Sequence, residues 1–356
     1  MMKTLKLLIV FTLAVLLLSR PAYGQADAEA ILASVNALPP KQRTEVLIAE
    51  ARKEGFIEWY GSLLVPEAMQ IIEKFRQRYP FVDVKYSRAS GTQVINRFLT
   101  ESKAGSYRAD VVGARSNFHP TLMKAGLVAK NLAPFRQELR DGFIDKAGYL
   151  LGQHTFGLVI GYNTRNVPPS KVPQSYQDLL SPEWKGQMAL DLESHDWLAG
   201  ILDTMGEEKG MDFAKKLAAQ NVHVQRGHSL LLQLVAAGEL KVEIDAYHYQ
   251  INEFRKKGAP LDLIIPDPMV VKEPSGIWIS KRAPHPHAAA LLVDFLFSRE
   301  GQQILAGLSV LVARKDIAWD FGGKQIKAIH VLSAEKWGPK YNDLARQFDE
   351  IFRKAK

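Results

Sequence analysis

Cysteine is absent from all 356 residues of the chain, and this absence excludes several classes of protein. A disulfide scaffold, a thiolate zinc site, an iron–sulfur cluster and a cysteine nucleophile all require this residue. Common enzyme motifs are also absent: the chain has no Gly-x-Ser-x-Gly, His-Glu-x-x-His, Gly-x-Gly-x-x-Gly or Gly-x-x-x-x-Gly-Lys-Ser/Thr. We therefore expect a protein that is not an enzyme and carries no resident cofactor.

The excess of positive charge is small. The chain has 46 Lys and Arg against 38 Asp and Glu, and the basic residues are scattered among acids, as in the segment 50–54. A dedicated nucleic-acid binder usually concentrates its basic residues in one stripe. With 47% hydrophobic and 24% charged residues, the composition is typical of a globular protein. We expect no nucleic-acid partner.

One long apolar run stands at the start of the chain. Two lysines precede the run 7–18, and Ala22 and Gly24 place small residues where a signal peptidase reads them. This layout predicts a secretory signal peptide over residues 1–24, cleaved before Gln25, and a periplasmic protein. A membrane anchor is the alternative, but a helix over this run is only about 18 Å long, against a hydrocarbon core of roughly 30 Å.

Strand and helix patterns alternate along the rest of the chain. Strands are predicted over 56–60, 82–86 and 109–113, with helices from Pro66 and over 92–103 between them. This order predicts a parallel sheet covered by helices.

The middle of the chain predicts a second α/β unit. Strands over 188–191 and 242–246 are accompanied by helices over 229–237 and 249–257. The fold class is therefore α/β, with two units.

Short motifs follow one another in a fixed order from about residue 45 to 310. Among them are Ala-Arg-Lys-Glu-Gly at 51–55, Phe-Arg-Gln-Arg-Tyr-Pro at 75–80, Tyr-Asn-Thr at 162–164, Ser-Pro-Glu-Trp-Lys-Gly at 181–186 and Ala-Pro-His-Pro-His-Ala-Ala at 283–289. In this order and spacing the chain resembles type II periplasmic solute-binding proteins of ABC transporters, in the ferric-iron-transport-like branch of extracellular solute-binding family 1. The resemblance implies two α/β lobes joined by two crossing strands, with a ligand cleft between them.

The resemblance also implies a division of the chain and a function. The expected parts are the signal peptide at 1–24, an N-terminal extension at 25–44, lobe one at 45–150 plus 270–325, lobe two at 155–265 and a C-terminal helical segment at 326–356. The expected function is to capture a small ligand by lobe closure and deliver it to a permease in the inner membrane. We expect a monomer in this role.

Candidate ligand-binding residues follow from the predicted strand ends. Ligands of open α/β sheets bind beyond the carboxyl ends of strands, where helix N-termini point. Arginines at three of these ends favour an anionic ligand, although each could instead lie on the surface or bridge the lobes, and the serine at 90 could serve only as a helix cap. The candidates are Ser62, Arg88, Ser90 and Arg115 in lobe one, and Asp196, Arg226, His228, Tyr247 and Tyr249 in lobe two.

The segment around Tyr247 bears on whether the ligand is ferric iron. Ferric-binding members of the family carry two adjacent tyrosines, and counting without gaps places that pair on His248 and Tyr249. Alternation in an extended segment would send Tyr247 and Tyr249 to the same side and His248 to the other. If the ligand is iron, the expected metal ligands are Tyr247, Tyr249 and Glu101, which lies near the position of a family carboxylate. The alternative is an aromatic cleft wall for an organic anion.

Two further functions stay open at this point. Abundant Ser, His and Asp could form the cleft active site of a secreted hydrolase, although no motif marks one. A ligand-sensing module for a membrane receptor would have the same fold as a transport protein.

Overall fold

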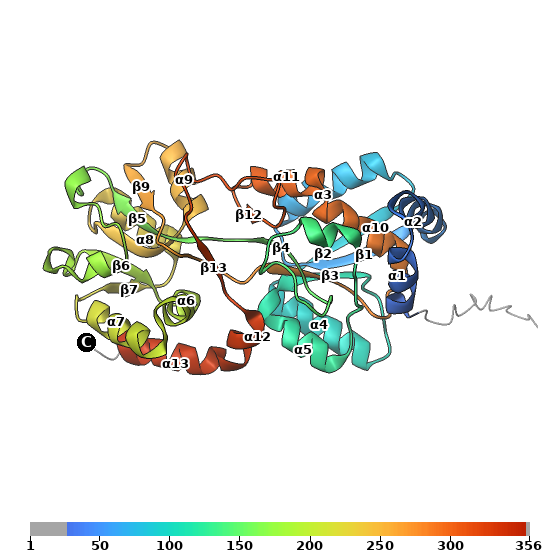
Figure 1. Ribbon diagram of the computed structural model, residues 1–356, viewed down its shortest axis with the longest axis horizontal. Helices are drawn as coiled ribbons and strands as arrows, with labels where there is room; N and C mark the ends of the chain where they lie inside the picture. Colours follow the sequence, from blue (N-terminus) through green and yellow to red (C-terminus); the bar gives the residue numbers. More distant parts are fainter. Residues whose placement is uncertain (1–26, 354–356) are drawn as a thin grey trace, which may run out of the picture.

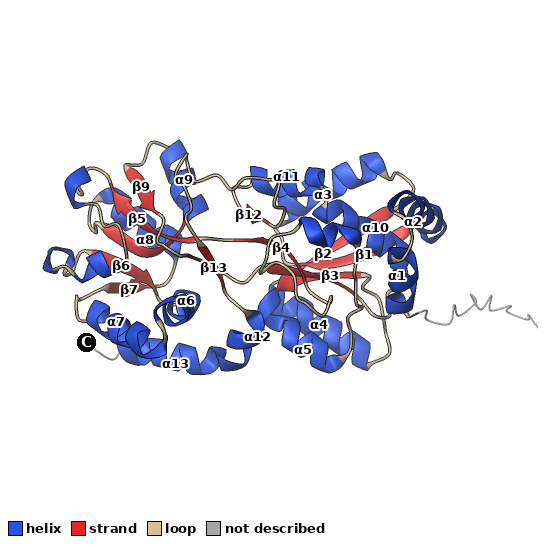
Figure 2. Ribbon diagram, viewed as in Figure 1, coloured by secondary structure: helices blue, strands red, loops and turns tan. Residues whose placement is uncertain are grey.

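The computed structural model describes residues 27–353, so the predicted signal peptide lies outside the described residues. The chain forms two α/β lobes side by side along its long axis (Figure 1). In each lobe a central sheet carries helices on its faces (Figure 2). Within residues 27–353, no helix combines the length and the apolar character that crossing a membrane would require.

Lobe one is built on a six-stranded sheet. Its first three strands run parallel, as predicted, because helices return the chain between them. β11 is antiparallel to both of its neighbours, and this strand enters the sheet from the second half of the chain. In sheet order the strands are β12 (Leu311–Val312), β4 (Leu151–Thr155), β11 (Ser275–Ile279), β3 (Val111–Arg115), β1 (Phe56–Gly61) and β2 (Asp83–Arg88).

Helices bury apolar faces against this sheet. On α3, Ile71, Ile72 and Phe75 recur at helical spacing and are each at most 1% exposed. The helices of lobe one are α1 (Ala28–Asn36), α2 (Pro40–Glu54), α3 (Val65–Arg78), α4 (Gly91–Lys103), α5 (His119–Ala125), α10 (Pro286–Phe297) and α11 (Arg299–Gly307).

The segment before the first strand is more helical than the sequence predicts. The sequence predicts a helix capped by Thr44, but α2 begins at Pro40. Proline lacks the N–H that the first turn of a helix leaves unpaired, so a helix can begin there. The Thr44 hydroxyl donates to the carbonyl of Pro40 instead of capping the helix. The preceding α1 contacts α2 and α10, so residues 28–54 pack onto lobe one.

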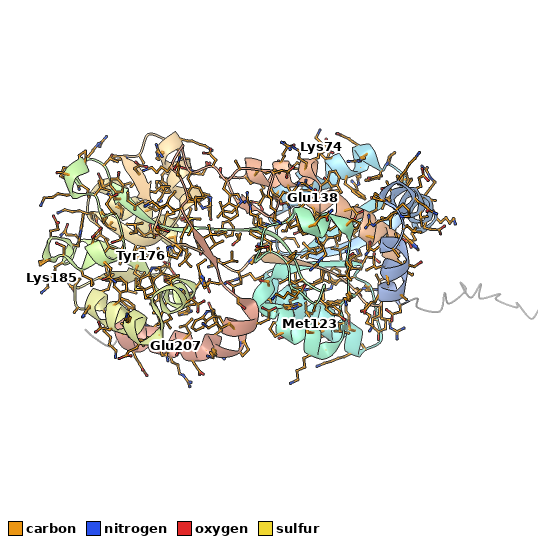
Figure 3. The ribbon with its side chains drawn as sticks, viewed as in Figure 1. Lys74, Met123, Glu138, Tyr176, Lys185 and Glu207 are labelled. Atoms are coloured by element: carbon orange, nitrogen blue, oxygen red, sulfur yellow. The ribbon has the colours of Figure 1, made fainter. Side chains whose placement is uncertain are left out.

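Lobe two is built on a five-stranded sheet. The strands predicted over 188–191 and 242–246 and the helices predicted over 229–237 and 249–257 agree with the observed bounds to within one residue. In sheet order its strands are β7 (His223–Gln225), β6 (Met188–Asp191), β8 (Val242–Tyr247), β5 (Leu158–Asn163) and β9 (Leu261–Ile264). Its helices are α6 (His195–Met205), α7 (Glu207–Ala218), α8 (His228–Ala237) and α9 (His248–Lys256). Tyr176 lies within this lobe, whereas Lys74, Lys185 and Glu207 lie at the outer edges of the molecule (Figure 3).

The resemblance implies crossings between the lobes near residues 155–162 and 261–278, and the chain crosses in these two places. The first crossing runs from β4 to β5 through Phe156 and Gly157, and the second runs from β9 through β10 (Met269–Val271) to β11. The C-terminal segment adds a further connection. β13 (Ile329–Val331) pairs with β10, α12 (Ala334–Trp337) contacts α5, and α13 (Tyr341–Phe352) packs on α6 and α7 (Figure 1).

Candidate functional site

A cavity of about 430 Å³ lies between the lobes. Lobe one contributes Ser62 and Arg115, which follow or end the parallel strands β1 and β3. Lobe two contributes Tyr247 and Tyr249 from the junction of β8 and α9. The crossing strands add Thr155, Phe156, Lys272 and Glu273. Carboxyl ends of parallel strands share one edge of a sheet, which explains why these positions converge. The other lining residues are polar or apolar side chains of lobe one: Leu63, Leu64, Glu67, His154, Ser275, Leu305, Leu308 and Val310.

Three aromatic rings form one wall of the cavity. The rings of Tyr247 and Tyr249 stack with centroids 5.8 Å apart and planes inclined by 19°. The Phe156 ring lies 5.6 Å from the first and 5.1 Å from the second. The wall is therefore continuous from the crossing strand to lobe two.

His248 does not line the cavity, as predicted, although its ring meets the edge of the Tyr249 ring with centroids 6.1 Å apart. Its side chain is buried, and its ring centroid lies 4.7 Å from that of Phe321. Burial lowers the pKa of His248 to about 4. The prediction assumed that residues 247–249 are fully extended. That assumption was wrong, because α9 begins at His248. The strand-to-helix junction still places Tyr247 and Tyr249 on the cavity together.

An ionic network joins the lobes at the back of the cavity. The Asp196 carboxylate accepts from Lys272 Nζ at 2.5 Å and from Arg115 Nη2 at 2.9 Å. The same Arg115 nitrogen lies 3.4 Å from Glu273 Oε1. Burial would raise the pKa of Asp196, but Lys272 and Arg115 outweigh it and hold that pKa at about 2. Asp196 thus links lobe two to lobe one and to a crossing strand.

Lys272 also holds a phenol of the aromatic wall. Its ammonium donates to Tyr247 Oη at 2.9 Å, and its backbone carbonyl accepts from the Thr155 hydroxyl at 2.6 Å. Burial raises the pKa of Tyr247, so its phenol is neutral at neutral pH. The phenol proton is thus available to donate to a ligand.

The sequence reasoning missed Lys272 and Glu273. Both lie within the predicted crossing 261–278. This position was the one available signal in the sequence, because charged side chains buried on a crossing strand must pair with other groups.

Six predicted residues lie outside the cavity lining: Asp196, which belongs to the ionic network, His228, Glu101, Arg88, Ser90 and Arg226. Arg88 is exposed at the end of β2, the edge strand of its sheet. Ser90 caps α4 by accepting from the Gln93 N–H. Arg226 pairs with Glu193 at 2.9 Å, and 70% of its side chain is exposed.

The carboxylate of Glu101 already has hydrogen-bond partners in lobe one. It accepts from the Tyr60 phenol at 2.8 Å and from Arg97 Nε at 2.8 Å. The structure therefore does not bring it together with Tyr247 and Tyr249.

His228 lies behind the aromatic wall. Its ring centroid is 4.3 Å from that of Tyr247, and its Nδ1 is 2.9 Å from Glu243 Oε1. Burial would lower the pKa of His228, but Asp245 and Glu243 raise it to about 9. This histidine contacts the wall rather than the cavity.

Comparisons with known proteins agree with this architecture. A family model described as bacterial extracellular solute-binding protein matches residues 108–316. The Fe(3+)-binding periplasmic protein of Serratia marcescens is 25% identical over 167 residues, which cover 44% of this chain and 49% of that protein. Iron uptake protein A1 of Synechocystis is 25% identical over 164 residues, 42% of this chain and 45% of that protein. The chain spans about half the length of the curated relatives it matches.

Solved structures show the same fold over most of the chain. Iron-bound HitA from Pseudomonas aeruginosa has a TM-score of 0.68 at 21% identity, covering 82% of this chain and 99% of that one. AfuA from Actinobacillus pleuropneumoniae, with fructose-6-phosphate bound, has a TM-score of 0.64 at 22% identity, covering 84% and 99%. These similarities confirm the predicted two-lobe fold. Because the family model matches more than half of its residues, the chain belongs to the bacterial extracellular solute-binding protein family.

Proposed function

We propose that this protein is the periplasmic substrate-binding component of an ABC importer, which captures a small anionic solute and delivers it to an inner-membrane permease. The observation that carries the proposal is the cavity shared by Ser62 and Arg115 of lobe one and Tyr247 and Tyr249 of lobe two. A solute that contacts both lobes favours the closed form through those contacts, and the closed form then docks on the permease. The solute is released unchanged, without chemistry.

The polar groups of the cavity favour an anion. Both ion pairs of Arg115 use Nη2, while 44% of its side chain is exposed. A guanidinium has five N–H donors, so others are available for a carboxylate or a phosphate. The neutral phenol of Tyr247 and the hydroxyl of Ser62 add further donors. The site is therefore rich in donors.

The size and the aromatic wall favour an organic solute. Cavities of roughly 300–1,000 Å³ are typical of sites for small molecules, and this one is about 430 Å³. The rings of Phe156, Tyr247 and Tyr249 offer a surface on which an apolar or flat part of the solute can stack.

Ferric iron, alone or in a complex with an organic anion, is the second candidate. The tyrosine pair supports it, as do the names of the relatives in Serratia marcescens and Synechocystis. Direct coordination requires Tyr247 to lose its proton and to exchange its bond with Lys272 for a bond to the ion. An iron–anion complex satisfies the donors and the phenols together.

One titration separates the two candidates. We expect organic acids or sugar phosphates to raise the melting temperature and decrease the radius of gyration in solution scattering. With ferric citrate we expect no tyrosinate–iron absorption band. A band that is lost in the double variant Tyr247→Phe, Tyr249→Phe and kept in Tyr107→Phe, which is outside the cavity, would assign iron instead. If neither anions nor iron complexes changed the melting temperature or the radius, solute capture by closure would be wrong.

A further inference from the structure

Three side chains of metal-binding type lie together in lobe two, behind the aromatic wall. His228 begins α8, and Glu243 and Asp245 lie two residues apart on β8. The register of β8 against β5 shifts between Glu243 and Ala246, so simple alternation does not place these two acids; their contacts with His228 of α8 bring them together. One donor atom from each residue lies within 4.8 Å of the others.

These separations suit a single ion. Two donors at about 2.0–2.4 Å from one cation are at most about 4.8 Å apart. His228 Nε2 lies 3.9 Å from Asp245 Oδ2, a separation that one ion between them would span. His228 Nδ1 lies 2.9 Å from Glu243 Oε1, so an N–H at Nδ1 donates to that oxygen. Because the pKa of His228 is raised, both ring nitrogens carry protons and this contact is an ion pair; an ion bound by one of the nitrogens would replace its proton.

A buried oxygen of the cluster has no partner. Glu243 is 0% exposed, and its Oε2 has no hydrogen bond among the described residues. Leaving a buried carboxylate oxygen unpaired is costly, so the site is incomplete as it stands. The neighbouring acids are better satisfied: Ser194 donates to Asp245, and the Gly227 N–H donates to Asp191.

The local balance of charge points the same way. Three acids, Asp191, Glu243 and Asp245, are at most 4% exposed around the single imidazole of His228, and burial raises the pKa of Glu243 to about 8 and also raises that of Asp245. Buried carboxylates require paired charge. One divalent cation would supply it while filling the free donor positions.

We propose that His228, Glu243 and Asp245 form a divalent-cation site inside lobe two. One imidazole and two carboxylates suit Zn²⁺, Co²⁺ or Mn²⁺ rather than a soft ion. The site is separate from the interlobe cavity, because the Tyr247 ring lies over the imidazole at 4.3 Å. The ion is therefore a component of the lobe and not the transported solute. This inference does not depend on which solute the cavity binds.

Titration of the full-length protein with Co²⁺ after EDTA treatment tests the proposal. We expect one equivalent to bind and produce a visible d–d absorption band. His228→Gln and Glu243→Gln should weaken binding by about 10- to 100-fold. His223→Gln is the matched control, since this exposed histidine on the neighbouring strand β7 contacts Gln225 at 2.9 Å and lies outside the cluster. Its Co²⁺ affinity should equal that of the unmodified protein.

Two outcomes would overturn the site. One is an equal Co²⁺ affinity in His228→Gln, His223→Gln and the unmodified protein; the other is a loss of binding in Tyr249→Phe, which would move the ion to the cavity. If the cluster variants fail to fold, a crystal of the unmodified protein soaked in Co²⁺ shows whether the cluster binds the ion. An anomalous peak between His228 and Asp245 supports the site, and a peak elsewhere or no peak refutes it. The probe is the metal alone, so failure here leaves solute capture unaffected.

Discussion

The two lobes each bury a histidine near the cleft, but in opposite electrostatic environments. In lobe one, burial lowers the pKa of His154 on β4 to about 4, and its Nδ1 has no hydrogen-bond partner among the described residues. In lobe two, Asp245 and Glu243 outweigh burial and raise the pKa of His228 to about 9. Nearby carboxylates, more than burial itself, therefore decide whether a buried imidazole is charged.

The same asymmetry appears where the lobes meet. Lobe one presents the cation Arg115 and lobe two presents the buried acid Asp196, and the two groups form a direct ion pair at 2.9 Å. The lobes are therefore electrostatically complementary without a ligand. A captured anion must share Arg115 with Asp196.

Removing Asp196, the buried acid of lobe two, should have the largest effect on the free energy of unfolding. Asp196→Ala leaves Lys272, whose side chain is only 14% exposed, without its carboxylate. Breaking a buried ion pair in this way is strongly destabilising, and we expect the free energy of unfolding to fall by about 3 kcal/mol. Urea unfolding at pH 7 measures this loss.

The matched control is Asp212→Ala. Asp212 pairs with Lys216 on the surface of lobe two, where its side chain is 61% exposed. Such a pair contributes about 0.5 kcal/mol or less. Equal losses in the two variants would show that the interlobe network is no stronger than a surface pair.

Stability at low pH should reveal the lowered pKa of His154 in lobe one. The unfolded chain binds a proton at His154 near pH 6.5, whereas the folded chain binds it only near pH 4. Stability is therefore lost as pH falls from 6.5 to 4, by up to about 3 kcal/mol from this group. His154→Gln should remove that part of the loss when unfolding is compared at pH 7 and pH 4.5. His223→Gln, at an exposed site, should keep the acid sensitivity of the unmodified protein; the same slope in His154→Gln would contradict the assignment.

Helix capping gives a smaller contrast between the lobes. Ser90 caps α4 in lobe one with its side chain, whereas Gly227 precedes α8 in lobe two without a side-chain cap. Ser90→Ala should cost about 1 kcal/mol of unfolding free energy. Solute affinity should stay within a factor of about two, since Ser90 lies outside the cavity lining. A tenfold weaker affinity in calorimetry would place Ser90 in the binding site after all.

Local patterns predicted most elements of the fold. The strand 188–191 and the helices on either side of β8 follow from apolar spacing and from glycines at their ends, and these are properties of contiguous residues. Alternation predicted the shared side of Tyr247 and Tyr249, but the strand-to-helix junction at His248 is what places both rings there. The start of α2 at Pro40 was missed, because Thr44 matched the pattern of a cap equally well.

The cavity itself depended on contacts between distant segments. Arg88, Arg115 and Arg226 look alike in the sequence, since each ends or directly follows a strand. Only the position of each strand in its sheet separates them: β3 lies inside the lobe-one sheet, whereas β2 and β7 are edge strands. Arg115 therefore reaches the cavity, and the other two stay exposed.

Local sequence patterns predicted the two α/β units and most of their helices and strands, because short-range periodicity controls these features. The tertiary structure alone decided which charged groups became partners. Lys272 joins Asp196, and His228 joins Glu243 and Asp245, only after crossing strands and sheet order bring them together. Burial then makes those pairings strong, because partners excluded from water must satisfy one another.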